Sequence, residues 1–240
     1  NSAKSQFSEN HIFEIFNYRK NNLLISTSKG LLQYDISLKQ VTELPFSGEA
    51  AEVLAKDHYS VYMQAQRYLW LVYEETAVMF DLQTGELDDL SEIASIVPLK
   101  KVYSFLGLLP NSQTMLFSTN DSLWGYDLDS KVVKRLYQHP DITASKWGSF
   151  DNWAIDKNNI FWLSYPTEGL IGLELPTFKA KYFYHSNNSI IDNNVYSLST
   201  DDDGDIWFSS HKGLFVLDSD NQHIRHFTLI DGLPALIFAV

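Results

Sequence analysis

The strongest constraint on the fold is an internal repeat of about 45 residues. In each of five copies, an apolar segment leads through a short turn into a second apolar segment that ends in an acidic residue. The acidic residues are Asp35, Asp81, Asp127, Glu174 and Asp218. Eleven or twelve residues before each of them stands a large apolar residue, here called the anchor. The anchors are Leu24, Trp70, Leu116, Trp162 and Trp207.

Each copy is expected to hold four short strands, and the fifth copy shows this most clearly. Its strands are predicted at residues 195–200, 206–209, 214–217 and 223–228. The turn at 201–205 suits a tight hairpin, because Asp and Gly tolerate left-handed backbone conformations. The best helix candidate is the short segment 91–97. Four antiparallel strands in about 45 residues are typical of a β-propeller blade.

The predicted fold is therefore all-β, a single β-propeller segment over residues 1–240 with about five four-stranded blades and the first strand of a sixth. The repeats are expected at residues 12–44, 59–90, 103–137, 152–184 and 195–228, with a partial sixth at 235–240. A blade cannot bury both faces alone, so the anchors are expected to pack between neighbouring blades. An unfinished sixth blade predicts a fragment of a longer propeller, or a ring that a second copy completes as a homodimer.

Composition narrows the classes of partner. The net charge is −12, from 18 basic and 30 acidic residues, and the longest basic run is Lys100-Lys101. Nucleic acid is therefore not an expected partner, because its binding needs a basic patch. There are no cysteines, which excludes disulfides and thiolate metal sites. No apolar stretch reaches membrane-spanning length, and no cofactor fingerprint is present, so neither a membrane segment nor a cofactor is expected in this chain.

The fifth copy carries a more specific pattern. It has the hairpin Asp201-Asp-Asp-Gly-Asp-Ile-Trp207, a turn ending in Gly213-Leu214, an aromatic-rich strand ending in Asp218, and a closing Asp231-Gly-Leu233. This pattern resembles the two-component regulator propeller repeat. The first and fourth copies match it less closely. The second and third copies depart from it, since Thr76 and Ser122 replace the turn glycine.

The resemblance implies a function for the region. Such repeats form the periplasmic sensor regions of hybrid two-component systems of the Bacteroidetes type, which detect glycan fragments and switch on polysaccharide-use genes. It implies a periplasmic, extracytoplasmic location and no enzymatic activity in this region, with any histidine kinase elsewhere in the parent protein. An oligosaccharide is then the expected ligand.

Candidate binding residues lie in the connections that share one face of a propeller. These are the links between blades, at about 45–58, 89–102, 138–151 and 185–194, and the turns between second and third strands. Trp147, in a polar loop, is the predicted stacking platform for a sugar ring. Tyr165, Asn194 and His211 are predicted to complete the site with an aromatic ring and polar groups.

Two other functions remain open at this level. One is a protein-interaction scaffold without a small ligand. The other is a propeller lyase, in which His211 and Glu168 would act as a His and Glu pair. A calcium site at Asp201–Asp205 is not expected, because Ser210 stands where a calcium loop needs its bidentate glutamate. No metal site and no catalytic set are therefore predicted.

Overall fold

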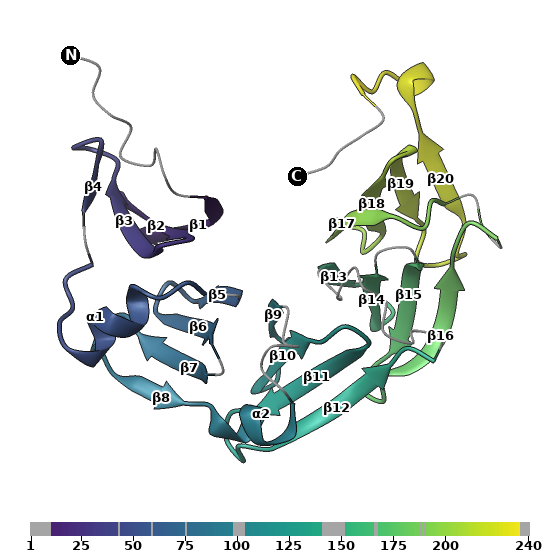
Figure 1. Cartoon of the computed structure of the whole chain (residues 1–240). Helices are drawn as coiled ribbons and strands as arrows, with labels where there is room; N and C mark the ends of the chain where they lie inside the picture. The colour runs from purple at the N-terminus through teal and green to yellow at the C-terminus, as the bar shows by residue number, and fades with distance from the viewer. Residues whose placement is uncertain are drawn as a thin grey trace. The chain divides into compact units, whose positions relative to one another are not determined.

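The computed structural model describes residues 11–42, 44–58, 60–74, 76–97, 104–140, 152–165, 168–187, 189 and 191–235. Within these ranges, twenty strands form five separate four-stranded antiparallel sheets (Figure 1). The predicted all-β fold with five four-stranded propeller blades is confirmed. The strand expected to open a sixth blade, at 235–240, lies almost entirely outside the described residues.

The strands follow one another along the chain in every blade. The first blade contains β1 (Ile12–Arg19), β2 (Asn22–Thr27), β3 (Gly30–Asp35) and β4 (Gln40–Thr42). The second contains β5 (Ser60–Gln64), β6 (Tyr68–Tyr73), β7 (Thr76–Asp81) and β8 (Leu87–Asp89). The third contains β9 (Ser104–Leu108), β10 (Thr114–Ser118), β11 (Ser122–Asp127) and β12 (Val133–Gln138). The fourth contains β13 (Asn152–Ile155), β14 (Ile160–Tyr165), β15 (Gly169–Glu174) and β16 (Lys179–Tyr184). The fifth contains β17 (Val195–Thr200), β18 (Ile206–Ser210), β19 (Gly213–Leu217) and β20 (Ile224–Phe227).

The chain divides into two compact units. One comprises residues 1–115 and 126–133, and the other comprises residues 116–125 and 134–240. The first unit thus holds the first two blades with part of the third. The second unit holds the rest of the third blade with the fourth and fifth.

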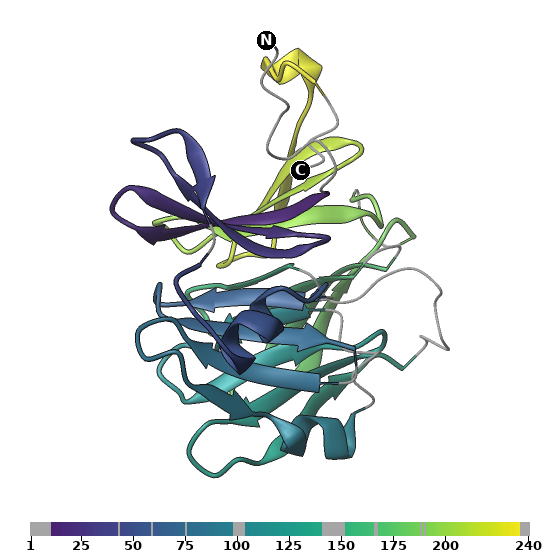
Figure 2. The same ribbon diagram turned by 60° about the vertical axis from the view of Figure 1, so that its left-hand side comes forward.

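Two short helices accompany the strands of the first unit. Helix α2 (Ser91–Ile96) follows β8, where the sequence favours a helix of one or two turns. Helix α1 (Glu49–Leu54) was not expected from the apolar pattern. It forms because Ala50, Val53 and Leu54 share one face and pack into a core with residues of the first two blades. Figures 1 and 2 both place α1 beside the second blade.

The tryptophan anchors are fixed by a hydrogen bond inside their own hairpin. The indole Nε1 of Trp70 donates to Gln64 over 2.9 Å, that of Trp162 to Asp156 over 2.9 Å, and that of Trp207 to Asp201 over 2.7 Å. The acceptor stands six residues before the indole in all three blades. A buried Trp needs such a partner, because an unpaired N–H away from water is costly.

The expected packing of the anchors between blades holds for the first two tryptophans and not for the third. Trp70 is fully buried and contacts Phe105 and Tyr126 of the third blade. Trp162 is also fully buried, in a core that includes residues of the fifth blade. Trp207 is only half-buried and stacks on Phe227 within its own blade, with ring centroids 5.7 Å apart.

The repeat acids organise the turn between the third and fourth strands. The Oδ1 atoms of Asp81 and Asp218 each accept two backbone N–H groups of that turn. Asp35 and Asp127 each accept one. These bonds satisfy the backbone of a tight turn and explain why an acid recurs at that position. Glu174 departs from this, since its backbone oxygen serves the turn while its carboxylate lies 3.4 Å from Lys181.

Candidate functional site

The loop end of the fifth blade brings together two of the predicted binding residues. Asn194 immediately precedes β17, and His211 stands in the turn between β18 and β19. Val195 pairs with Ser210 in the sheet, so Asn194 and His211 extend from adjoining strand ends. His211 is exposed, whereas Asn194 is half-buried.

Tyr196 belongs to the same site, although it was not a predicted ligand residue. Its hydroxyl is in direct contact with Nε2 of His211, and the two rings meet edge to face with centroids 4.8 Å apart. Burial, and to a lesser extent the charge of Asp192, raise the pKa of Tyr196, so the phenol stays protonated at neutral pH.

The turn that carries His211 is firmly held. Ser210 Oγ accepts the backbone N–H of Lys212 over 2.9 Å, and Nε2 of His226 lies 2.7 Å from the Lys212 carbonyl oxygen. The His226 ring stacks on Phe215, with centroids 4.1 Å apart and an interplanar angle of 1°. These contacts fix the backbone while the His211 side chain remains exposed, which suits a recognition site on a rigid scaffold.

The connection before β17 is fixed in a similar way. Asn193 Oδ1 accepts the backbone N–H of Ser186 over 2.6 Å, and Asp192 Oδ1 accepts that of Asn194 over 3.1 Å. Asn152 of the fourth blade donates through Nδ2 to the Tyr196 carbonyl oxygen over 2.8 Å. Hydrogen bonds within the link and from the fourth blade therefore position the segment that presents Asn194.

The other two predicted ligand residues are not part of this cluster. Tyr165 was expected in an exposed turn, but it is the last residue of β14 and is fully buried. Its hydroxyl donates to the Asn120 carbonyl oxygen over 2.5 Å, and its ring packs beside His139. Trp147 lies outside the described residues. A role for either in ligand binding stays a prediction.

The acid-rich turn of the fifth blade has a structural explanation. The Asp201 carboxylate accepts the indole N–H of Trp207 and the backbone N–H groups of Asp203 and Asp205. The hydrogen bond from Trp207 is the largest influence lowering the pKa of Asp201. Across the described ranges, no three His, Asp or Glu side chains are grouped so as to hold a metal ion.

The loop end of the fifth blade matches a known family. Residues 189–212 match the model of a family described as "Two component regulator propeller". The chain carries a regulator propeller repeat. That repeat spans Asn194, Tyr196 and His211, so the clustered site lies within the matched residues.

Solved structures with the same fold include two bacterial extracellular domains. The extracellular domain of the putative hybrid two component system BT4673 from B. thetaiotaomicron is 18% identical, with a TM-score of 0.70. The alignment covers 95% of this chain and 29% of that one. The corresponding domain of BT3049 from the same organism is 16% identical, with a TM-score of 0.63, and 94% of this chain matches 30% of that one. This chain therefore spans less than a third of either extracellular domain.

A more distant protein shares the propeller architecture as well. Saccharomyces cerevisiae Sqt1 is 12% identical, with a TM-score of 0.64 over 90% of this chain and 61% of that one. No curated protein matches the chain significantly in sequence. None of the helices in the described ranges is long and apolar enough to cross a membrane.

Proposed function

We propose that this chain is a ligand-sensing part of the extracytoplasmic region of a hybrid two-component system, and that it binds an oligosaccharide fragment in the periplasm. The observation that carries the proposal is the position of the His211–Tyr196 pair. It lies inside the regulator propeller repeat, with the imidazole exposed and the backbone around it fixed. Regulation of polysaccharide-use genes would follow through a kinase elsewhere in the parent protein.

The chemistry of the cluster suits a sugar. His211 and Asn194 supply donors and acceptors for ring hydroxyls, and exposed Lys212 adds a cation at the same turn. The Tyr196 ring provides an apolar contact beside them. Binding rather than catalysis is the function proposed for this region.

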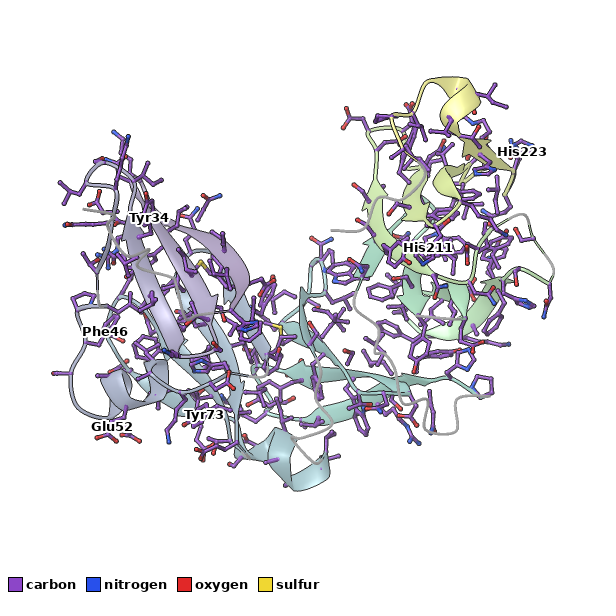
Figure 3. The ribbon with its side chains drawn as sticks, turned by 45° about the horizontal axis from the view of Figure 1, so that its top comes forward. Tyr34, Phe46, Glu52, Tyr73, His211 and His223 are labelled. Carbon is purple, nitrogen blue, oxygen red and sulfur yellow. The ribbon has the colours of Figure 1, made fainter. Side chains whose placement is uncertain are left out.

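Binding of an oligosaccharide panel, measured by titration calorimetry, tests the proposal. His211→Ala should weaken binding of any oligosaccharide hit about tenfold, because one buried polar contact to a ligand is worth about 1.4 kcal/mol. His223→Ala is the matched control. His223 is an exposed histidine of the same blade, but it lies beyond the turn at the other end of β19, and Figure 3 labels both side chains.

The same variants can be tested in signalling. A parent sensor carrying His211→Ala should need more oligosaccharide to induce its target genes, and one carrying His223→Ala should respond normally. Equal responses from both variants and the unaltered sensor would contradict this site. Recovery of one stoichiometric protein partner, with no oligosaccharide bound, would instead favour the interaction scaffold.

A further inference from the structure

Each blade of this protein has two different faces. Side chains alternate between the two sides of a strand, so a blade has an anchor face, which carries the anchor, and a back face on its other side. In the first blade, Leu24 and Phe16 pair on the anchor face. They share a core with Leu69, Leu71 and Phe80, which lie on the back face of the second blade. Within the first unit, an anchor face therefore packs on the back face of the following blade.

The second unit follows the same rule. Trp162 and Leu170 lie on the anchor face of the fourth blade. They share a core with Phe208, Phe215 and Leu217, which lie on the back face of the fifth blade. All five residues are at most 1% exposed. Burial of apolar side chains between an anchor face and a back face is thus what joins consecutive blades.

The back face of the first blade is apolar but largely exposed. Ile15 is 56% exposed, while its cross-strand partner Ile25 is buried. The half-buried apolar residues of this face are Leu23, Leu32, Tyr34 and Val41, of which Figure 3 labels Tyr34. Each stands 46 residues before an apolar residue of the back face of the second blade, where Leu69, Val78 and Phe80 are at most 5% exposed. The first blade therefore keeps the apolar residues of a packed face on a surface that is exposed.

The anchor face of the fifth blade is the complementary surface. It carries Trp207, Leu214 and Phe227 at the places that Trp162, Leu170 and Tyr184 occupy in the fourth blade. Trp207, Leu214 and Phe227 are all half-buried, although the matching Trp162 and Leu170 are fully buried. The Trp207 and Phe227 rings stack with centroids 5.7 Å apart and an interplanar angle of 11°, so they form a preformed aromatic surface. The fifth blade thus presents the type of face that covers a back face in both units.

We propose that these two faces bind each other between copies of this chain, so that the back face of the first blade packs on the anchor face of the fifth blade of a second copy. In both units the surface that covers a back face is an anchor face, and a second copy brings one of matching chemistry. Because the two faces differ, the contact is heterologous, and each pair of copies keeps one free face of each kind. The interface includes neither His211 nor its ligand and does not depend on the proposed function.

Sedimentation equilibrium and light scattering on the 240-residue chain test the proposal. The mass should rise from 27.6 kDa at high dilution to twice that value or more at high concentration. A Kd of about 10 µM is expected for an apolar contact of this kind, so the range from about 1 to about 100 µM covers the transition.

Ile15→Glu and Ser199→Glu each place a carboxylate on one of the two faces. Ser199 is exposed and pairs with Trp207 on the anchor face of the fifth blade. Each variant alone should stay at 27.6 kDa, because burying an unpaired carboxylate is costly. Both positions are exposed in the single chain, so the thermal midpoint at high dilution should not change. Lys134→Glu, at an exposed position on β12, adds the same group elsewhere and should associate as the unaltered chain does.

A mixture of the two variants tests the orientation of the contact. Ile15→Glu keeps the fifth-blade face and Ser199→Glu keeps the first-blade face, so the mixture should form a one-to-one dimer and nothing larger. Association of either variant alone would overturn the proposal, since like faces would then be pairing. A single-chain mass for the unaltered protein at every concentration would also overturn it, and would mean that the faces are covered within the chain or by the rest of the parent protein. His211→Ala should associate normally, so failure here is distinct from failure of the His211 site.

Discussion

At the scale of single residues, the acceptor placed six positions before each tryptophan anchor accounts for much of the repeat. Asp156 shows the most complete version. It is 4% exposed, and its carboxylate accepts the N–H groups of Asn158 and Ile160 as well as the indole N–H of Trp162. One side chain therefore closes the hairpin and orients the largest ring of the blade core.

Asp156→Ala should destabilise the chain by about 2–4 kcal/mol, because three hydrogen bonds are lost and the buried indole N–H is left unpaired. The free energy of unfolding in urea, followed by tryptophan fluorescence, measures this. Asp201→Ala should cost less, since Trp207 is only half-buried. Exposed Asp202→Ala is the control and should have little effect. A similar loss in all three variants would show that the effect is not specific to the anchors.

At the scale of elements, the glycine of the turn between second and third strands is fixed by geometry. Gly213 has φ +125°, and a Cβ there would clash with the carbonyl oxygen of Phe227 on β20. Gly169 has φ +85° and the same relation to Tyr184 on β16. Only glycine combines this conformation with such close approach of the fourth strand.

Gly213→Ala should therefore destabilise the fifth blade by about 2–4 kcal/mol, through both backbone strain and the clash. Gly232→Ala is a matched control. Gly232 has φ +94°, but nothing lies within 4 Å of its Cβ position, so only the strain of about 1 kcal/mol applies. Urea unfolding of the two variants measures the difference. Equal losses would mean that the fourth strand moves aside at no cost.

The strands were largely predictable from sequence because turn residues recur at matching positions in the copies of the repeat. In the fifth copy, each predicted strand begins and ends within one residue of the observed one. Helix α1 was missed because one and a half turns carry too little apolar period to stand out, and tertiary packing stabilises it. Tyr165 was misplaced because the turn after it begins one position later than the repeat suggested.

The candidate sites were harder to predict than the fold. His211 could be found because it stands in a recognisable turn, and Asn194 could be found because it ends the link that leads into β17. Tyr196 could not be found in this way, since an aromatic residue in the first strand of a blade is normally expected to be a core residue.

At the scale of the whole molecule, the chain combines one specific repeat with four divergent ones. Only residues 189–212 match the family model, although five blades are present. The blade sequences can diverge because a position needs a side chain that fills its space in the core, and more than one residue type can do so. Leu24 and Leu116 fill the anchor position as fully buried residues without an indole. Blade architecture therefore persists where the sequence signature has been lost.

The stability of the fold at acid pH is expected to depend on one buried histidine. His58 follows α1 in the link between the first and second blades, is 5% exposed, and meets Tyr73 edge to face (Figure 3 labels Tyr73). Burial lowers its pKa from 6.5 to about 4, and the backbone of Val53 offsets this only in part. Between pH 6.5 and about pH 4, the unfolded chain takes up a proton that the folded chain does not.

Stability should therefore fall as the pH drops from 6.5 to about 4, by about 3 kcal/mol from His58 alone. Asp81 and Asp218, whose pKa values are lowered by Arg67 and by the turn backbone respectively, lose their contribution only as the pH falls below 3.8. Urea unfolding at pH 7, 5 and 4 measures the loss of stability between pH 6.5 and about 4.

His58→Phe keeps a ring beside Tyr73 but cannot titrate, so its stability should change less between pH 6.5 and about 4. His223→Gln should retain the full slope, and an unchanged slope in His58→Phe would assign the acid sensitivity to other groups.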